Sequence, residues 1–215
     1  SKRKAEIADW FYLPYWKPSV PSTTQQLAAS SQACTVVLID ECGVGAQLVE
    51  RLRAENKSVI TVKNGVEFTQ LSEDQYALNP SQSDDYEALL KDLIARQKHP
   101  ERIVHMWNVT AMSEIETGLT AAEKAQEIGF YSLLFLAQAL GKQNLNEALQ
   151  LTVVSNGLQS VTGEEMLSPE KATLLGPVKV IPQEYLNISC RSIDEVLASA
   201  GSWQQEDLID HILAE

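Results

Sequence analysis

A glycine-containing turn after a run of apolar residues is the first feature that could do chemistry. In LIDECGVGAQL, residues 38–48, Gly43 and Gly45 occupy the first two glycine positions of a dinucleotide-binding turn. Leu48 holds the third position, where a glycine would let helix and strand pack closely, so it is expected to crowd that contact or push the helix outward. Asp40 and Glu41 stand where a pyrophosphate would approach, and their charges oppose it. The sequence therefore favours a tight strand–helix connection over a working NADP site.

The same loop also resembles the glycine loop of S-adenosylmethionine methyltransferases, in which an acidic residue precedes a glycine pair. Those enzymes usually carry an Asp or Glu at the end of the second strand, where it binds the ribose hydroxyls. Here the second predicted strand ends in Val62-Lys63-Asn64, so the acid is missing. Lys63 could face a 2′-phosphate, but a lone lysine after a strand is usually a solvated end.

A second candidate chemistry is the proton donation of a short-chain reductase. Such an enzyme needs a Ser at the end of the fourth strand and a Tyr at the start of the next helix, with a cation nearby to lower the Tyr pKa. Ser155 ends the predicted strand, but the helix begins SPEKATLLG without a Tyr. We interpret Ser168 as a helix cap and Lys171 as a solvent-facing residue of the first turn. Tyr185 follows the helix and is misplaced for proton donation, so Ser155 is interpreted as a strand-end hydroxyl.

The remaining nucleophiles and metal ligands form no recognisable site. His105 lies in a predicted buried strand beside Trp107, where a hydrogen-bonded core histidine is expected rather than a base. No spacing typical of a metal site or a Cys–His pair joins the other candidates, which are His99, His211, Cys34, Cys42 and Cys190. We therefore expect no catalytic, cofactor-binding or metal-binding residue in this chain.

The elements that would position these residues alternate between strand and helix. Apolar and β-branched runs predict five strands, and four-residue spacing of apolar side chains predicts helices between them. We expect a truncated Rossmann-like α/β fold, similar to short-chain reductases, with five or so mostly parallel strands and helices on both faces. The strands are expected at 33–40, 58–63, 102–109, 149–156 and 188–194, and the helices at 44–56, from Ser83 or Asp84 to 98, 121–141, 168–181 and 202–215. Residues 67–80 are expected to be irregular or to contain a strand, and Gly176-Pro177 is expected to kink or interrupt the fourth helix.

An N-terminal region precedes this domain. Residues 10–17, WFYLPYWK, predict an aromatic strand that pairs with something large, and residues 18–33 predict a polar linker. The domain boundary is therefore placed between residues 1–33 and residues 34–215.

Composition excludes several classes of function. The net charge of −12, with scattered Lys and Arg, argues against nucleic-acid binding. No apolar stretch approaches 18 residues, so no membrane span is expected. Three cysteines without a CxxC pair do not form a disulfide framework, which favours a reducing cytoplasm.

Several segments together resemble one family, the structural subdomain of modular type I polyketide synthase ketoreductases. The resemblance runs from about Ile7 to Asp194 and is most specific in the aromatic segment WFYLPYWKPS and in EKATLLGPVKVIPQEY followed by SCRSID. The other segments are VVLIDECGVGAQLVERL, IVHMWNVT, GFYSLLFLAQAL and VVSNGLQSVTGEE, in the order of the family.

The resemblance implies a supporting role. In that family the ketoreductase has two Rossmann-like halves; the first is truncated and binds no cofactor, and the second carries NADPH and the Ser-Tyr pair. It implies that this chain is the first half and that its partners are the catalytic half of the same polypeptide and other synthase domains. The whole enzyme would reduce a β-keto group on a carrier-protein-bound chain. The sequence leaves open whether an active half follows and which domain lies between the halves. A free-standing NADP-dependent short-chain reductase and a methyltransferase remain the alternatives.

Overall fold

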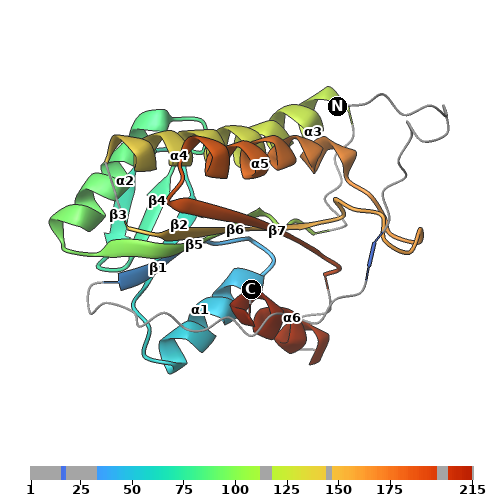
Figure 1. Ribbon diagram of the computed structural model, residues 1–215, viewed down its shortest axis with the longest axis horizontal. Coiled ribbons are helices and arrows are strands. Elements are labelled where there is room, and N and C mark those ends of the chain that lie inside the picture. The colour runs from blue at the N-terminus through green and yellow to red at the C-terminus, as the bar shows by residue number, and fades with distance from the viewer. Residues whose placement is uncertain (1–15, 18–32, 112–117, 144–146, 198–202, 215) are drawn as a thin grey trace, which may run out of the picture.

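The protein forms one sheet between two helical layers (Figure 1). The computed structural model describes residues 16–17, 33–111, 118–143, 147–197 and 203–214. One layer contains α2 (Ser83–Ala95), α3 (Leu119–Ala125), α4 (Ser132–Lys142) and α5 (Leu175–Glu184); the other contains α1 (Val44–Ala54) and α6 (Trp203–Ala214). The prediction of a Rossmann-like sheet with helices on both faces is confirmed.

The sheet has seven strands in the order β3-β4-β2-β1-β5-β6-β7. Every neighbouring pair is parallel except β3 and β4, which form an antiparallel hairpin. The expected five strands are present, and β3 and β4 add two more from the segment that was expected to be irregular or to contain a strand. The strands are β1 (Ala33–Leu38), β2 (Val59–Asn64), β3 (Thr69–Ser72), β4 (Gln75–Leu78), β5 (His99–Asn108), β6 (Leu149–Asn156) and β7 (Ile188–Glu195).

Side chains alternate between the two faces of each strand, and each face has its own core. Val36 and Leu38 of β1 join a cluster with residues of α2, α4 and α5, whereas Val37 joins a cluster with residues of α1 and α6. The runs of buried residues in β1, β2 and β6 follow from this double coverage, because a parallel strand packed on both faces is apolar throughout.

The long helix expected at 121–141 is present, but it contains a π-helical segment at Gln126–Tyr131. The widened turn leaves the Ile128 carbonyl oxygen free to accept hydrogen bonds from Ser132 Oγ at 2.7 Å and Asn108 Nδ2 at 3.4 Å. Gly129 lies against Asn108, and a Cβ at this position would be 3.0 Å from Asn108 Oδ1. The helix therefore approaches β5 closely because of a local change of winding that apolar periodicity does not encode.

The helix expected at 168–181 was only partly correct. Residues Pro169–Leu174 form a 3₁₀ turn, and α5 begins at Leu175. A kink or interruption was expected at Gly176-Pro177. The winding changes from 3₁₀ to α-helical at Leu175, and Pro177 lies in the first turn of α5, where its missing N–H has no helical acceptor in any case. Neither Ser168 nor Ser83 forms a side-chain cap; the residue before α2 is Gln82.

The N-terminal aromatic strand and linker fall largely outside the described residues, apart from Trp16 and Lys17, so the boundary between residues 1–33 and 34–215 stays a prediction. The Ser202 cap also lies outside them. Among the helices that the structure describes, none is long and apolar enough to cross a bilayer.

Candidate functional site at the carboxyl edge of the sheet

The carboxyl ends of β1, β5, β6 and β7 meet at one edge of the sheet. The strand order reverses between β1 and β5, and open parallel sheets bind ligands at such a reversal. Polar residues lie at the end of each of these strands, and most are buried: Asp40 just after β1, Asn108 in β5, Ser155 and Asn156 in β6, and Asp194 in β7. We call this set the carboxyl-edge cluster.

Asp40 occupies the amino terminus of α1. Its carboxylate accepts hydrogen bonds from the backbone N–H groups of Gly45, at 2.5 Å, and Val44, at 3.2 Å. The side chain is 6% exposed. We expected Asp40 to repel a phosphate by its charge; the structure adds that it also uses two of the N–H groups to which a phosphate at this helix end would bind.

The glycines of the turn have different tasks. Gly43 has a φ of +92°, a conformation that L side chains rarely adopt. Gly45 makes the close contact between helix and strand, because a Cβ there would lie 2.8 Å from Asp40 Oδ1 and 3.1 Å from Ile39 Cγ1. Leu48 was expected to crowd this contact or displace the helix. Instead it is fully buried in the cluster beneath the sheet, so it serves as a core residue.

Ser155 is a strand-end hydroxyl, as expected. Its Oγ donates to Asp194 Oδ1 at 3.0 Å. Asp194 also accepts from the backbone N–H groups of Leu158, at 2.9 Å, and Gln159, at 2.7 Å. Sequence reasoning missed Asp194, although an acid at the end of the last parallel strand, beside the loop after β6, could have indicated its role.

Lys171 corrects the prediction of a solvent-facing residue. It is 5% exposed, and its Nζ donates to Asn156 Oδ1 at 2.8 Å and to the Asn156 carbonyl at 3.0 Å. The 3₁₀ winding of this turn directs the side chain inward, where an α-helical first turn was assumed. Burial lowers the pKa of Lys171.

Asn156 links this lysine to the end of β5. Its side-chain amide accepts from the Thr110 N–H at 3.0 Å and donates to the Thr110 carbonyl at 2.9 Å. The network Lys171–Asn156–Thr110 therefore joins the 3₁₀ turn, β6 and the segment after β5. The polar atoms of this network hydrogen-bond to one another. We call the network a brace, because it holds these three segments together.

Tyr185 lies away from the carboxyl-edge cluster. It follows α5, and its N–H donates to the Ile181 carbonyl at 2.8 Å. The ring packs on Gly141 of α4, where an added Cβ would be 2.9 Å from the Tyr185 hydroxyl oxygen. Tyr185 therefore lies close to the start of β7, at the edge of the sheet opposite the carboxyl-edge cluster.

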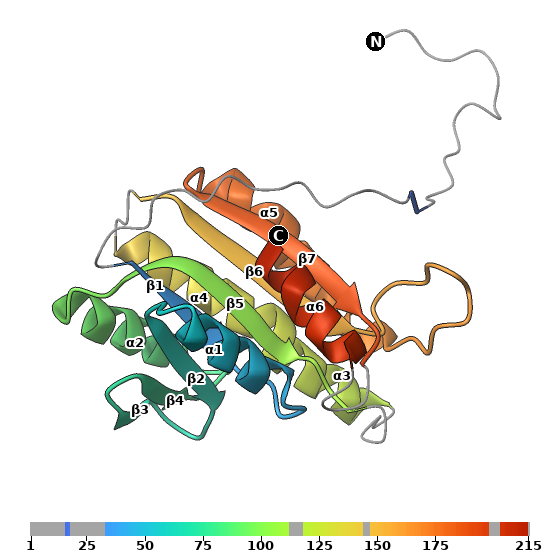
Figure 2. The ribbon, with the colours of Figure 1, turned by 90° about the horizontal axis from the view of Figure 1, so that it is seen from below.

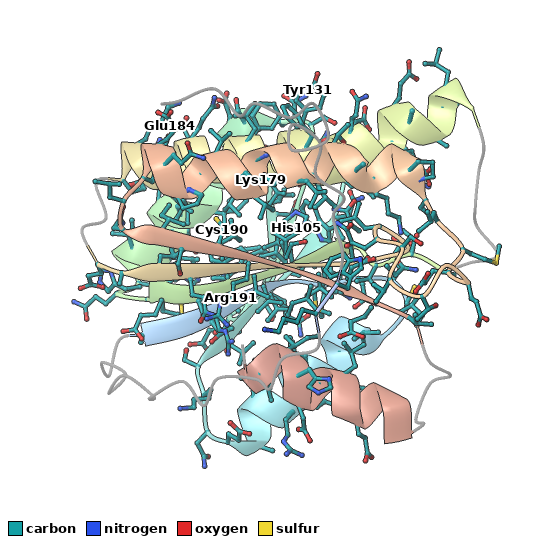
Figure 3. The ribbon with its side chains drawn as sticks, turned by 45° about the vertical axis from the view of Figure 1, so that its right-hand side comes forward. His105, Tyr131, Lys179, Glu184, Cys190 and Arg191 are labelled. Atoms are coloured by element: carbon teal, nitrogen blue, oxygen red, sulfur yellow. The ribbon has the colours of Figure 1, made fainter. Side chains whose placement is uncertain are left out.

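His105 is the buried core histidine that was expected. It is fully buried, its ring lies 5.3 Å from that of Trp107, and Nε2 is 2.8 Å from Ser132 Oγ (Figure 3). Because the Ser132 hydroxyl donates its proton to Ile128, Nε2 carries the ring proton and donates to Ser132. Burial lowers the pKa of His105 to about 3, so the ring is neutral.

Because His105 is neutral when buried, we expect the free energy of unfolding to depend on pH. In the unfolded chain His105 takes up a proton near pH 6.5, whereas in the folded chain its ring stays neutral. The free energy of unfolding therefore falls as the pH decreases from 6.5 to about 3. Between pH 6.5 and 5.5 we expect a loss of about 1 kcal/mol in the free energy of unfolding, measured by urea titration. In His105→Gln, which cannot titrate, the loss should vanish; an unchanged slope would assign it to another group.

The three cysteines and Lys63 lie in different environments. Burial raises the pKa of Cys34 and of Cys190 to about 11, which disfavours a thiolate at either site. Cys42 Sγ donates to the Val109 carbonyl at 3.6 Å. Lys63 is exposed at the end of β2. No group of three potential metal ligands occurs among the described residues.

This chain is similar to one protein family and to several solved structures. A family model described as "Beta-ketoacyl synthase-like, N-terminal" matches residues 35–215. No curated protein matches the chain. A solved multidomain structure with adenylation, ketoreductase and pseudo Asub domains of a keto acid-selecting NRPS module is 26% identical, with a TM-score of 0.78. The match covers 92% of this chain and 16% of that one.

Two further structures show the same fold. An N-terminal ketoreductase from the macrolactin assembly line is 18% identical over 84% of this chain and 35% of its own, with a TM-score of 0.66. A short-chain dehydrogenase/reductase from Brucella ovis, solved with a partially ordered NAD, is 16% identical over 84% and 92%, with a TM-score of 0.59. This chain thus corresponds to less than half the length of the NRPS module structure and of the macrolactin ketoreductase. The resemblance to the structural subdomain of synthase ketoreductases is confirmed, and the protein belongs to the beta-ketoacyl synthase-like, N-terminal family.

Proposed function

We propose that this chain is the non-catalytic structural half of a ketoreductase in a synthase module. It supports a separate catalytic half that uses NADPH to reduce a β-keto group on a carrier-protein-bound chain. In this role it binds no cofactor and contributes no catalytic residue, and its partners are the catalytic half and the neighbouring domains of the module.

The hydrogen bonds of Asp40 carry this proposal. A dinucleotide bound at this turn would need N–H groups at the start of α1, and the Asp40 carboxylate already accepts from those of Val44 and Gly45. Its negative charge opposes a pyrophosphate at the same point. A fold that resembles a cofactor-binding domain therefore has its own carboxylate at the usual phosphate position.

The other strand ends support the same interpretation. Ser155, the counterpart of a reductase serine by its strand-end position, donates to Asp194, and Lys171 donates to Asn156. These bonds join elements of the same domain, so the groups stabilise the carboxyl edge instead of facing a substrate. The ketoreductases among the similar structures suggest which enzyme such a scaffold serves.

The test is to express this chain alone and together with the reductase half encoded in the same reading frame. We expect the two halves to elute as one species from a sizing column, and NADPH to be oxidised in the presence of a carrier-linked β-keto substrate. The chain alone should show no NADPH binding by fluorescence titration at micromolar concentrations. Separate elution of the halves would count against a supporting role.

A thermal-shift assay of the isolated chain distinguishes the two alternative functions, because each predicts stabilisation by a different cofactor. A ligand at 100 times its dissociation constant adds about 2.7 kcal/mol to the free energy of unfolding, so a bound cofactor is readily seen. Stabilisation by NADPH would support a free-standing short-chain reductase, and stabilisation by S-adenosylmethionine would support a methyltransferase.

A further inference from the structure

The loop between β6 and the 3₁₀ turn, residues 157–168, is closed and projects beyond the sheet (Figure 2). The Ser168 N–H donates to the Gly157 carbonyl at 2.6 Å and joins the two ends of the loop. Gly157 has a φ of +69°, and a Cβ there would lie 2.8 Å from the Met166 carbonyl oxygen. A loop of this length with joined ends forms a compact unit of its own.

Two carboxylates hold the backbone of this loop. At its base, Asp194 of β7 accepts the N–H groups of Leu158 and Gln159. At its tip, the Glu165 carboxylate accepts from the N–H groups of Thr162, at 2.6 Å, Gly163, at 2.9 Å, and Val161, at 3.1 Å. These bonds lower the pKa of Glu165 to about 2, so the tip keeps its shape at neutral pH.

This ordered loop exposes apolar side chains. Met166 is 65% exposed, Val161 56% and Leu167 47%. A loop whose backbone is fixed by several hydrogen bonds presents these side chains to solvent without burying them in its own interior. Several exposed apolar residues on one fixed element indicate a contact surface.

One residue from the N-terminal region, Trp16, forms a hydrogen bond with the backbone of this loop. Trp16 Nε1 donates to the Ser160 carbonyl at 2.7 Å, and the Trp16 side chain is 54% exposed. The two residues are 144 positions apart in the sequence. Trp16 belongs to the aromatic segment 10–17, which also contains Trp10, Phe11, Tyr12 and Tyr15.

We propose that the loop 157–168 is the docking site of the chain's own aromatic segment, residues 10–17. The indole hydrogen bond of Trp16 fixes one end, and the aromatic side chains cover Val161, Met166 and Leu167. A methionine suits this task because its flexible thioether adapts to aromatic rings. The proposal does not depend on the ketoreductase assignment.

The chain length permits this path. Trp16 contacts a loop at the carboxyl edge, whereas Ala33 begins β1 at the opposite edge. The fifteen residues between Lys17 and Ala33 can span up to about 50 Å when extended, and a six-residue strand such as β1 is about 20 Å long. The chain between them is therefore long enough to join Trp16 at the carboxyl edge to Ala33 at the opposite edge.

The experiment uses the full chain labelled with ¹⁵N-tryptophan. The chain has four tryptophans, and the signals of Trp10 and Trp16 are assigned with Trp10→Phe and Trp16→Phe. We expect Glu165→Gln to make the Trp16 indole proton exchange with water about tenfold faster, the change that corresponds to the loss of one ordinary hydrogen bond. The matched control is Glu164→Gln, which removes the same charge from an exposed neighbour.

A second variant tests the apolar contact. Met166→Ser with Leu167→Ser should shift the Trp10 signal and speed its exchange. The buried Trp107 should be unchanged in every variant, which shows that the fold is intact. The proposal is overturned if the Trp16 indole exchanges as fast as free indole in the unaltered chain, or if Glu165→Gln behaves like Glu164→Gln. It is also overturned if the Trp10 and Trp16 signals depend on protein concentration, because a second copy would then occupy the loop.

Discussion

Leu48→Gly, which completes the three-glycine pattern of a dinucleotide turn, is expected to destabilise the protein without creating a cofactor site. The Leu48 side chain is fully buried beneath the sheet. We expect the free energy of unfolding to fall by about 4 kcal/mol, most of it from the cavity and the rest from glycine within a helix. Urea denaturation measures the loss, and NADPH titration tests the site.

The matched control is Ala46→Gly, an exposed position of the same helix. It should cost about 1 kcal/mol, because only helix propensity changes. Equal losses at both positions would contradict a core role for Leu48. NADPH binding by Leu48→Gly would contradict the role assigned to Asp40, whose carboxylate still accepts from Val44 and Gly45 in this variant.

Lys171→Met is expected to lower the free energy of unfolding by about 2–3 kcal/mol, because it keeps the aliphatic stem but removes a charged donor from buried acceptors. The two Asn156 oxygens that accept from Nζ would lose this partner. The change should also loosen the contact between Asn156 and Thr110, seen as faster amide exchange at Thr110.

Lys179→Met is the control for this variant, since Lys179 is an exposed lysine of α5 (Figure 3). We expect it to change stability by no more than about 0.5 kcal/mol. If Lys171→Met is equally mild, the buried hydrogen bonds of Lys171 contribute little, and the network after β6 is not the brace described above.

The sequence was most informative where burial and spacing act together. The five main strands were predicted because β-branched, apolar runs are needed where a sheet is covered on both faces. The short hairpin β3–β4 was left open, because β3 is exposed along its whole length and carries no apolar alternation. Only its pairing with β4 makes it a strand.

The candidate site was predictable in part. Leu48 and the missing Tyr were sufficient to disfavour a reductase, but the hydrogen bonds of Asp40 depend on how the chain turns at Gly43. Lys171 was misplaced because side chains rotate by a larger angle per residue in a 3₁₀ turn than in an α-helix, which changes the face on which a residue lies. Asp194 acts on a loop more than thirty residues earlier, a relation that local patterns do not contain.

The Asp40 carboxylate is in effect a tethered competitor for any anion that approaches α1. A group joined to its binding site by a few bonds acts at an effective concentration of millimolar or more, whereas a free dinucleotide acts at its bulk concentration. The competitor cannot diffuse away or be diluted. Restoring phosphate affinity at this turn would therefore require removal of the internal anion itself, and added glycines alone would not achieve it.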